Sequence, residues 1–217
     1  MIGPLFDPSW IGDNVDGLLD KTWEHVLLTA IAVALGFLIS FPLGLYAYRH
    51  RRAYPLLAGI AGTLYTIPSL ALFAFLVPFT GLSVTTAEIG LVSYTLLIII
   101  RNVVVGLDGV PDDVREAARG MGYTDRQLLW RVEVPLALPV IVAGVRIAAV
   151  TTIGLVTVTA LIGQGGLGYY ILLGLGRLFT TAVIVGAALS VVLAVVADRL
   201  LIATERRLAP WAARRAT

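Results

Sequence analysis

The sequence holds few residues suited to catalysis or metal binding. It has no cysteine and only two histidines, His25 and His50, which are too few and too far apart for a histidine metal cluster. It contains no serine–histidine–aspartate arrangement, no HExxH pair and no GxxxxGK[ST] phosphate-binding loop. The glycine-rich stretch 164–168 lacks the lysine that such a loop needs. We therefore expect no metal, no cofactor and no enzymatic activity on this chain, so that any catalysis comes from a partner.

The chemically unusual side chains are polar groups inside long apolar segments. These are Arg101, Asn102 and Arg146. A charge at membrane depth is costly and usually faces protein or water, which makes each arginine a candidate functional residue. Arg101 lies near the end of its apolar segment, so the favoured interpretation is that its side chain extends to the interface. A role in a polar pathway is the alternative.

The composition shows which elements must carry these residues. Of 217 residues, 58% are hydrophobic and 14% are charged, and the mean hydropathy is +0.89. Soluble domains have about 25% charged residues. This excludes an ordinary cytosolic enzyme, a disordered chain and a nucleic-acid-binding module. Because about 20 apolar residues span a membrane, we predict an all-α membrane protein with five spans, at residues 26–48, 55–79, 86–107, 135–162 and 179–201.

Two apolar segments carry features that disturb a regular helix. Pro68 lies in the middle of the second span, where it should kink or break the helix. The stretch 163–176 contains six glycines in 14 residues, which makes a regular lipid-facing helix unfavourable. We interpret it as a packed external loop or a short re-entrant helix rather than a sixth span.

The distribution of basic residues predicts the orientation. With five spans, one side receives only Lys21 and Arg177, and the other receives arginines 49, 51, 52, 115, 119, 126, 131, 199, 206, 207, 214 and 215. The positive-inside rule places the N-terminus outside and the C-terminus in the cytoplasm. The chain then divides into an extracytoplasmic segment at 1–25, a transmembrane domain at 26–202 and a basic cytoplasmic tail at 203–217.

The segment 108–134 is the one long loop on the predicted cytoplasmic side, and it has helical signals. Pro111 followed by two aspartates is typical of a helix start, and glycines follow that helix. Thr124 and Gln127 match a capping box for a second helix, which we expect Pro135 to end. Physical chemistry alone leaves two interpretations, a compact projection into the cytoplasm and an amphipathic connector on the membrane surface.

The same loop carries a recognisable motif. The string EAARGMG, nine further residues and VEVP resemble the EAA loop of the permeases of ABC importers, with Val132 and Val134 as conservative replacements. The resemblance implies a type I importer permease fold of the methionine-importer kind. It also implies that the loop couples the permease to an ATPase through Glu116, Ala117, Ala118, Gly120, Gly122 and Pro135.

Four other segments extend the resemblance over about half of the chain. YTIPSLALFAFLVPFTGL, IIIRNVVVGLDGVP, PLALPVIVAGVRIA and ALIGQGGLG are similar to permeases of osmoprotectant importers in the bacterial cytoplasmic membrane. This implies a small compatible solute as substrate, such as glycine betaine, choline or carnitine. The implied partners are two ATPase subunits that bind ATP and Mg²⁺, a second permease copy or paralogue, a separate extracytoplasmic binding protein and membrane lipid, but no nucleic acid.

Alternatives remain for the function and for the pathway. The chain could serve methionine or another small organic solute, or act as a non-transporting membrane scaffold or sensor. Tyr65 could contact a quaternary ammonium through its ring or belong to the interfacial aromatic belt. The osmoprotectant permeases carry a similar Gly-x-Arg at Arg146, which favours an ion pair with Asp198 or Asp108 over contact with a substrate carboxylate. Thr151 and Thr157 could line a polar path or permit close helix packing.

Overall fold

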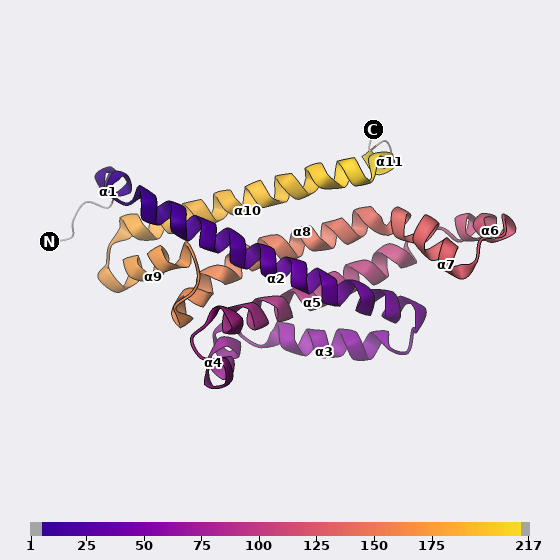
Figure 1. Ribbon diagram of the computed structural model, residues 1–217, viewed down its shortest axis with the longest axis horizontal. Coiled ribbons are helices and arrows are strands. Elements are labelled where there is room, and N and C mark those ends of the chain that lie inside the picture. Colours follow the sequence, from indigo (N-terminus) through magenta and orange to yellow (C-terminus); the bar gives the residue numbers. More distant parts are fainter. Residues whose placement is uncertain (1–5, 214–217) are drawn as a thin grey trace.

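The computed structural model describes residues 6–213, and they fold into a bundle of long helices with short helices at both ends (Figure 1). Backbone polar groups have no water partners inside a bilayer, so helices satisfy them within each segment. In chain order the helices are α1 Pro8–Asp13, α2 Val15–Arg49, α3 Tyr54–Thr66, α4 Ser69–Thr80, α5 Val84–Asp108, α6 Asp112–Gly120, α7 Asp125–Leu128, η1 Leu129–Glu133 (a π-helical turn), α8 Val134–Val158, η2 Thr159–Ile162 (a 3₁₀ turn), α9 Gly168–Arg177, α10 Thr180–Leu208 and α11 Pro210–Ala213.

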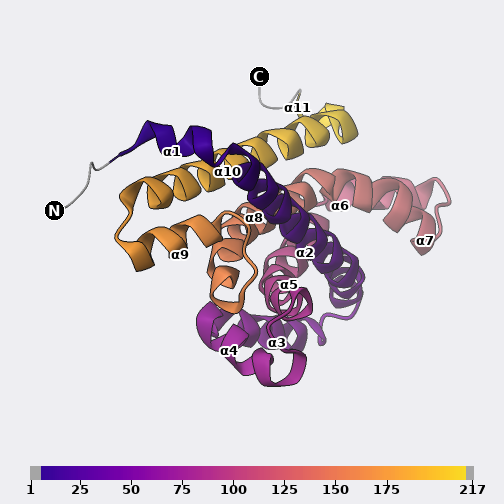
Figure 2. The same cartoon turned by 60° about the vertical axis from the view of Figure 1, so that its left-hand side comes forward.

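The five predicted spans correspond to four straight candidates and one broken pair. Among the described residues, α2, α5, the continuous segment Asp125–Ile162 and α10 are long and apolar enough to cross a membrane. The fifth candidate is the pair α3 and α4, which meet at an angle of 94°. Figure 2 shows α4 lying across the end of α3 rather than continuing it. The all-α prediction is therefore confirmed, and the described residues form four candidate spans, or five if the bent pair counts as one span.

The break in the second span lies at Pro68, as the sequence predicted. Helix α3 ends at Thr66, and Ile67 and Pro68 have extended ψ angles of 127° and 132°. Proline disfavours a helical conformation of the residue before it, which explains the turn at Ile67. The hydroxyl of Tyr94 on α5 donates a hydrogen bond to the carbonyl of Ile67. The carbonyl that the break releases is thereby satisfied inside the protein.

Helix α5 forms the centre of the bundle and has the largest set of buried residues of any helix. Glycines let its neighbours approach closely. A Cβ at Gly36 of α2 would lie 1.9 Å from the Thr95 hydroxyl, and a Cβ at Gly44 would lie 2.7 Å from Val103. Small residues at such contacts are the usual basis of tight helix packing in membranes. The contacts fix α2 against α5 along most of their length.

The glycine-rich stretch 163–176 forms a turn and the short helix α9, which confirms that it is not a sixth span. Gly163, Gly165 and Gly166 have φ angles of +80°, +118° and +49°, a region that favours glycine. The N–H of Gly166 donates to the carboxylate of Glu24 at 3.1 Å. Helix α9 then folds back along α10 (Figure 1).

The prediction that Pro135 ends the second loop helix is wrong. Helix α7 continues through η1 into α8 without a break, so that 125–162 forms one helical segment. The reason is the position of the proline. Pro135 is the second residue of α8 and directly follows the π-helical turn, whose wider spacing tolerates a residue that lacks an N–H donor.

The helices cross both boundaries of the transmembrane domain drawn from the sequence. Helix α2 starts at Val15, so the last part of segment 1–25 is continuous with the first span. Helix α10 extends past 202 to Leu208. Arg214 and Arg215, which the sequence assigned to a basic tail, lie outside the described residues.

Candidate functional site

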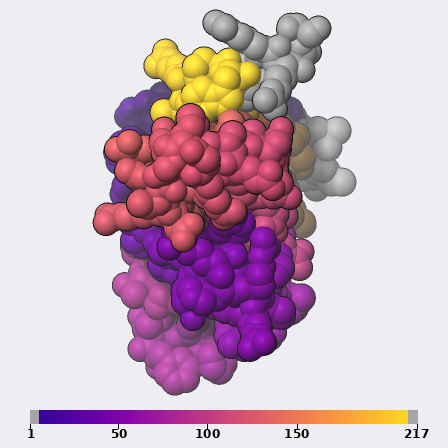
Figure 3. All heavy atoms as spheres, turned by 90° about the vertical axis from the view of Figure 1, so that its right-hand side faces the viewer, coloured from indigo at the N-terminus to yellow at the C-terminus, as the bar shows by residue number. Residues whose placement is uncertain are grey.

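The EAA-like loop forms a projection at one end of the bundle, called here the loop end. Figure 3 views this end directly and shows the surface of the loop between the end of α10 and the α2–α3 turn. On α6, Glu116, Ala117 and Gly120 are exposed, whereas Ala118 is buried against the rest of the loop. The motif therefore divides into one buried anchor and an exposed face that a partner can reach.

Gly122 provides the turn between the two loop helices. Its φ angle is +85°, and a Cβ at this position would meet no atom within 4 Å. The N–H of Tyr123 donates to the carbonyl of Ala118, and the N–H of Gly122 donates to that of Arg119, which is the hydrogen-bonding pattern of a Schellman motif. The positive φ angle is therefore the reason why this position favours glycine, since no described atom of the chain would meet a Cβ here.

The second loop helix starts where the sequence placed it. Thr124 accepts a hydrogen bond from the N–H of Gln127, and the Gln127 side chain accepts one from the N–H of Thr124. This capping box satisfies donors at the helix N-terminus that would otherwise lack partners. Pro135 is half-buried at the far end of the same segment. The motif residues 116–135 thus enclose one compact helix–turn–helix unit.

Arg115 holds this unit on the bundle, and the sequence reasoning missed it. Its Nε donates to the Glu133 carboxylate at 2.9 Å, and its Nη2 donates to the Leu107 carbonyl at 2.7 Å. Burial by itself would lower the pKa of Arg115, but the hydrogen bonds to Glu133 and Asp112 outweigh it and raise the pKa above its ordinary value. The guanidinium is therefore charged throughout the physiological range.

Tyr48 completes the same network. Its hydroxyl donates to Glu133 at 2.8 Å and accepts from Arg115 at 3.1 Å. These two hydrogen bonds give Tyr48 a structural role at the end of α2. The available sequence signal was Glu133, a carboxylate between two valines directly before Pro135 that needs a partner.

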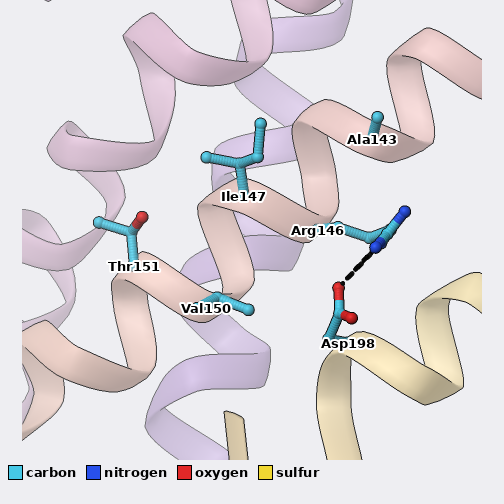
Figure 4. Close-up of a pocket in the computed structure, with 6 residues that line it drawn as sticks. All are labelled: Ala143, Arg146, Ile147, Val150, Thr151 and Asp198. Carbon is cyan, nitrogen blue, oxygen red and sulfur yellow. Dashed lines mark hydrogen bonds and ion pairs between the residues drawn. The ribbon is translucent and has the colours of Figure 1, made fainter. Parts of the chain in front are cut away.

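The predicted ion pair of Arg146 is confirmed, and its partner is Asp198. Figure 4 shows Arg146 on α8 directed at Asp198 on α10, and two guanidinium nitrogens lie 2.9 Å from one carboxylate oxygen. Glu205 lies 3.6 Å from the remaining nitrogen. Asp108, the other predicted partner, pairs with Arg51 at the loop end. Arg146 and Thr151 line the same open pocket, of about 430 Å³.

The other pathway candidates lie apart from this pocket. Tyr65 and Pro68 are exposed at the α3–α4 break, where the Tyr65 ring packs edge-on against Tyr94 with ring centres 5.9 Å apart. Arg101 is exposed on α5 and forms no ion pair with a described residue. The side chains of Asn102 and Thr157 donate to carbonyls of their own helices.

The structure therefore brings together only part of the predicted pathway set. The chain provides three separate groups, namely the break with its two tyrosines, the exposed Arg101 and the Arg146 pocket. Within the described residues, no three histidine, aspartate or glutamate side chains are placed to hold a metal ion.

Comparison with known proteins decides the family. Residues 32–210 match the family described as the inner membrane component of binding-protein-dependent transport systems. The chain belongs to this family. Members are membrane-embedded permease components of ABC importers and are not the ATPase of the complex. This chain is accordingly a multi-pass inner membrane component of a transporter that includes an ATPase and a binding protein.

Curated relatives cover nearly the whole chain. The choline transport system permease protein OpuBB of Bacillus subtilis is 40% identical over 203 residues, which is 93% of each chain. The carnitine transport permease protein OpuCB of Listeria monocytogenes is 40% identical over 209 residues, 96% of this chain and 95% of that one. The glycine betaine/carnitine/choline permease protein OpuCB of B. subtilis is 37% identical over 93% of each chain.

Solved structures match the fold. An inward-facing structure of the MetNI methionine ABC transporter has a TM-score of 0.80 and 25% identity, and it covers 90% of this chain and 98% of that one. An amino acid ABC transporter matches with a TM-score of 0.70 at 20% identity, covering 93% of this chain and 98% of that one. The prediction of a permease fold like that of the methionine importer is confirmed.

Proposed function

We propose that this chain is the permease of an importer for a small osmoprotectant of the choline, glycine betaine or carnitine class. The observation that carries this proposal is the level of identity. Three permeases named for these solutes are 37–40% identical to the chain over more than 90% of its length. The methionine system reaches 25%, which makes methionine the weaker alternative.

The substrate proposal is tested with the complete importer in liposomes. The permease is reconstituted with the ATPase and the binding protein of its own system, and uptake of labelled choline, glycine betaine, carnitine and methionine is measured. We expect ATP-dependent uptake of at least one of the first three solutes and none of methionine. Uptake of methionine alone would establish the alternative substrate. Absence of uptake for every solute would favour a scaffold or sensor.

We also propose that two copies of this permease, or this chain and a paralogue, assemble with two ATPase subunits. The loop supports the contact with the ATPase, because Glu116 and Ala117 are exposed on a helix that projects from the bundle. The second permease is supported by α3 and α4. In the single chain, Ala61 is the only buried residue of α3. Most of the apolar surface of α3 and α4 is therefore exposed and must be covered by protein or lipid.

Among the pathway candidates, Tyr65, Pro68 and Arg101 are the ones we propose to line the path of the solute. All three are exposed in the single chain, and an unpaired charge at membrane depth favours a protein- or water-lined position for Arg101. The charge of Arg146 is neutralised by Asp198, which favours a structural role for Arg146 in holding α8 against α10. Asn102 and Thr157 satisfy their own helices, and Thr151 borders the Arg146 pocket.

The contact with the ATPase is tested by Glu116→Lys and Gly122→Trp. Charge reversal at Glu116 should weaken the proposed contact of its carboxylate with the ATPase, by about 1–3 kcal/mol if that contact is a charged hydrogen bond. A bulky residue at Gly122 should disrupt the turn. Both variants should reach the membrane, bind less ATPase on co-purification and lose uptake together with substrate-stimulated ATP hydrolysis. Arg126→Glu, a charge reversal at an exposed residue of α7, is the control. Normal transport by both variants would reduce the loop to a connector.

A further inference from the structure

Four segments of the chain meet at the Arg115 guanidinium. Arg115 comes from α6, Tyr48 from the end of α2, the Leu107 carbonyl from the end of α5, and Glu133 from the last position of η1. The donor–acceptor distances lie between 2.7 and 3.1 Å. We call these four groups the Arg115 clamp. It joins the exposed loop helix to three long helices, because η1 is continuous with α8.

The Arg115–Glu133 pair of the clamp is much less exposed than the Arg51–Asp108 pair at the same end. The side chains of Arg115 and Glu133 are 14% and 7% exposed. Those of Arg51 and Asp108 are 63% and 39% exposed, and such surface pairs contribute little. A buried pair loses much more when one partner is removed, since the other charge is left without compensation. The clamp is therefore the polar contact that holds this end of the bundle together.

Few other contacts fix α6 in place. Ala118 is its only buried residue, and Arg115 is half-buried through its part in the clamp. A small alanine side chain can slide on its neighbours, whereas a guanidinium with three differently directed partners resists rotation as well as translation. Displacement of α6 must therefore either break the clamp or carry the ends of α2, α5 and η1 with it.

The π-helical turn is a suitable place for such a displacement to act. It comprises Leu129–Glu133, and π-helical turns within α-helices are strained and concentrate at functional sites. Glu133 accepts bonds from both Arg115 and Tyr48, so a movement of α6 pulls directly on the last residue of this turn. The base of the long helix α8 follows immediately.

We propose that Arg115 is a positioning residue that transmits movement of the loop helix to α2, α5 and α8 during transport. The inference rests on the proposed function as an ATP-driven permease. Arg115 acts through Glu133, Tyr48 and the Leu107 carbonyl and contacts neither solute nor nucleotide. When Arg115 is replaced, ATP hydrolysis continues but moves less solute. The reason is that the exposed face with Glu116 remains available to the ATPase, whereas the link to the long helices is lost.

The test measures uptake and ATP hydrolysis in the same liposomes, using the complete importer. Arg115→Lys keeps the charge but loses the forked geometry, and Tyr48→Phe removes one hydrogen bond. We expect ATPase subunits to co-purify normally with both variants. The ratio of solute transported to ATP hydrolysed should fall roughly tenfold or more in Arg115→Lys, as expected for loss of hydrogen bonds to a charged group. Tyr48→Phe should lie between this variant and the wild type.

Arg119→Lys is the matched control, because it makes the same substitution at an exposed arginine of the same helix that forms no ion pair with a described residue. Its transport ratio should equal that of the wild type. An unchanged ratio in Arg115→Lys, or a parallel loss of ATPase binding and of both activities, would overturn the proposal. If Arg115→Lys does not reach the membrane, the ratio in Tyr48→Phe decides by the same criterion. Failure of the proposed function is distinguishable, since the wild-type complex itself would then transport none of choline, glycine betaine and carnitine.

Discussion

At the scale of single residues, the loop shows how one motif combines different physical requirements. Gly122 is needed for its positive φ angle, Ala118 for its burial, and Glu116 is left exposed for a partner. Arg115 lies next to Glu116 in the sequence but points into the bundle. Neighbouring positions on a short helix thus serve opposite faces, because successive side chains are about 100° apart around the axis.

Glu88 on α5 gives a prediction at this scale. Its side chain is buried, and neither carboxylate oxygen has a hydrogen-bond partner in the described part of the chain. An unpaired polar group in such a place is destabilising. Glu88→Met, which keeps the length but removes the polar group, should raise the free energy of unfolding by about 1–3 kcal/mol. Thermal unfolding of the purified permease in detergent, followed by tryptophan fluorescence, measures the change.

Glu24→Met provides the matched control for Glu88. The Glu24 carboxylate accepts from Lys21 at 2.6 Å and from the N–H of Gly166 at 3.1 Å, so its removal should lower the unfolding temperature. Opposite signs for the two substitutions support the assignment of Glu88 as an unpaired group. A lower unfolding temperature in Glu88→Met would show that a cation or a second subunit contacts its carboxylate.

At the scale of elements, two prolines act differently although both lie in apolar segments. Pro68 separates α3 from α4, and the Ile67 carbonyl that the break releases accepts a hydrogen bond from the Tyr94 hydroxyl. Pro135 leaves its helix intact because the π-helical turn comes directly before it. The effect of a proline in a membrane helix therefore depends on the groups that compensate for its missing donor.

Pro68→Ala tests whether the break contributes to transport. Alanine permits a helical conformation at Ile67, so α3 and α4 should become more nearly continuous and uptake should slow while expression is unchanged. Uptake into liposomes is compared at equal permease content. Pro78→Ala, inside α4 and away from the break, should transport at the wild-type rate. Wild-type uptake in Pro68→Ala would leave the break as a tolerated feature without a function.

At the scale of the whole molecule, the distribution of basic residues agrees with the position of the EAA-like loop. The loop end carries Arg51, α6, α7 and the end of α10, whereas Lys21, Arg177 and α9 lie at the opposite end (Figure 1). Those of the basic residues predicting the cytoplasmic side that the structure describes thus gather at the end with the EAA-like loop. A cytoplasmic ATPase can bind the EAA-like loop only if the loop lies at the cytoplasmic end of the bundle.

The orientation itself is tested with single cysteines in the naturally cysteine-free chain. Ser9 and Arg207 are exposed at opposite ends. In intact cells an impermeant maleimide should label Ser9→Cys at once and Arg207→Cys only after permeabilisation. Labelling with the accessibilities exchanged would reverse the orientation and place the EAA-like loop outside the cell.

The sequence by itself determined the membrane class, the positions of the apolar segments, the break at Pro68 and the loop motif. These follow from apolar length, local backbone preferences and residue spacing, which act over short stretches of chain. The tertiary structure alone decided that Arg146 pairs with Asp198 and not Asp108, and that Arg115 finds Glu133 and Tyr48. Such choices depend on which helices lie side by side. Several carboxylates are chemically equivalent partners for an arginine, and only packing brings one of them within hydrogen-bonding distance.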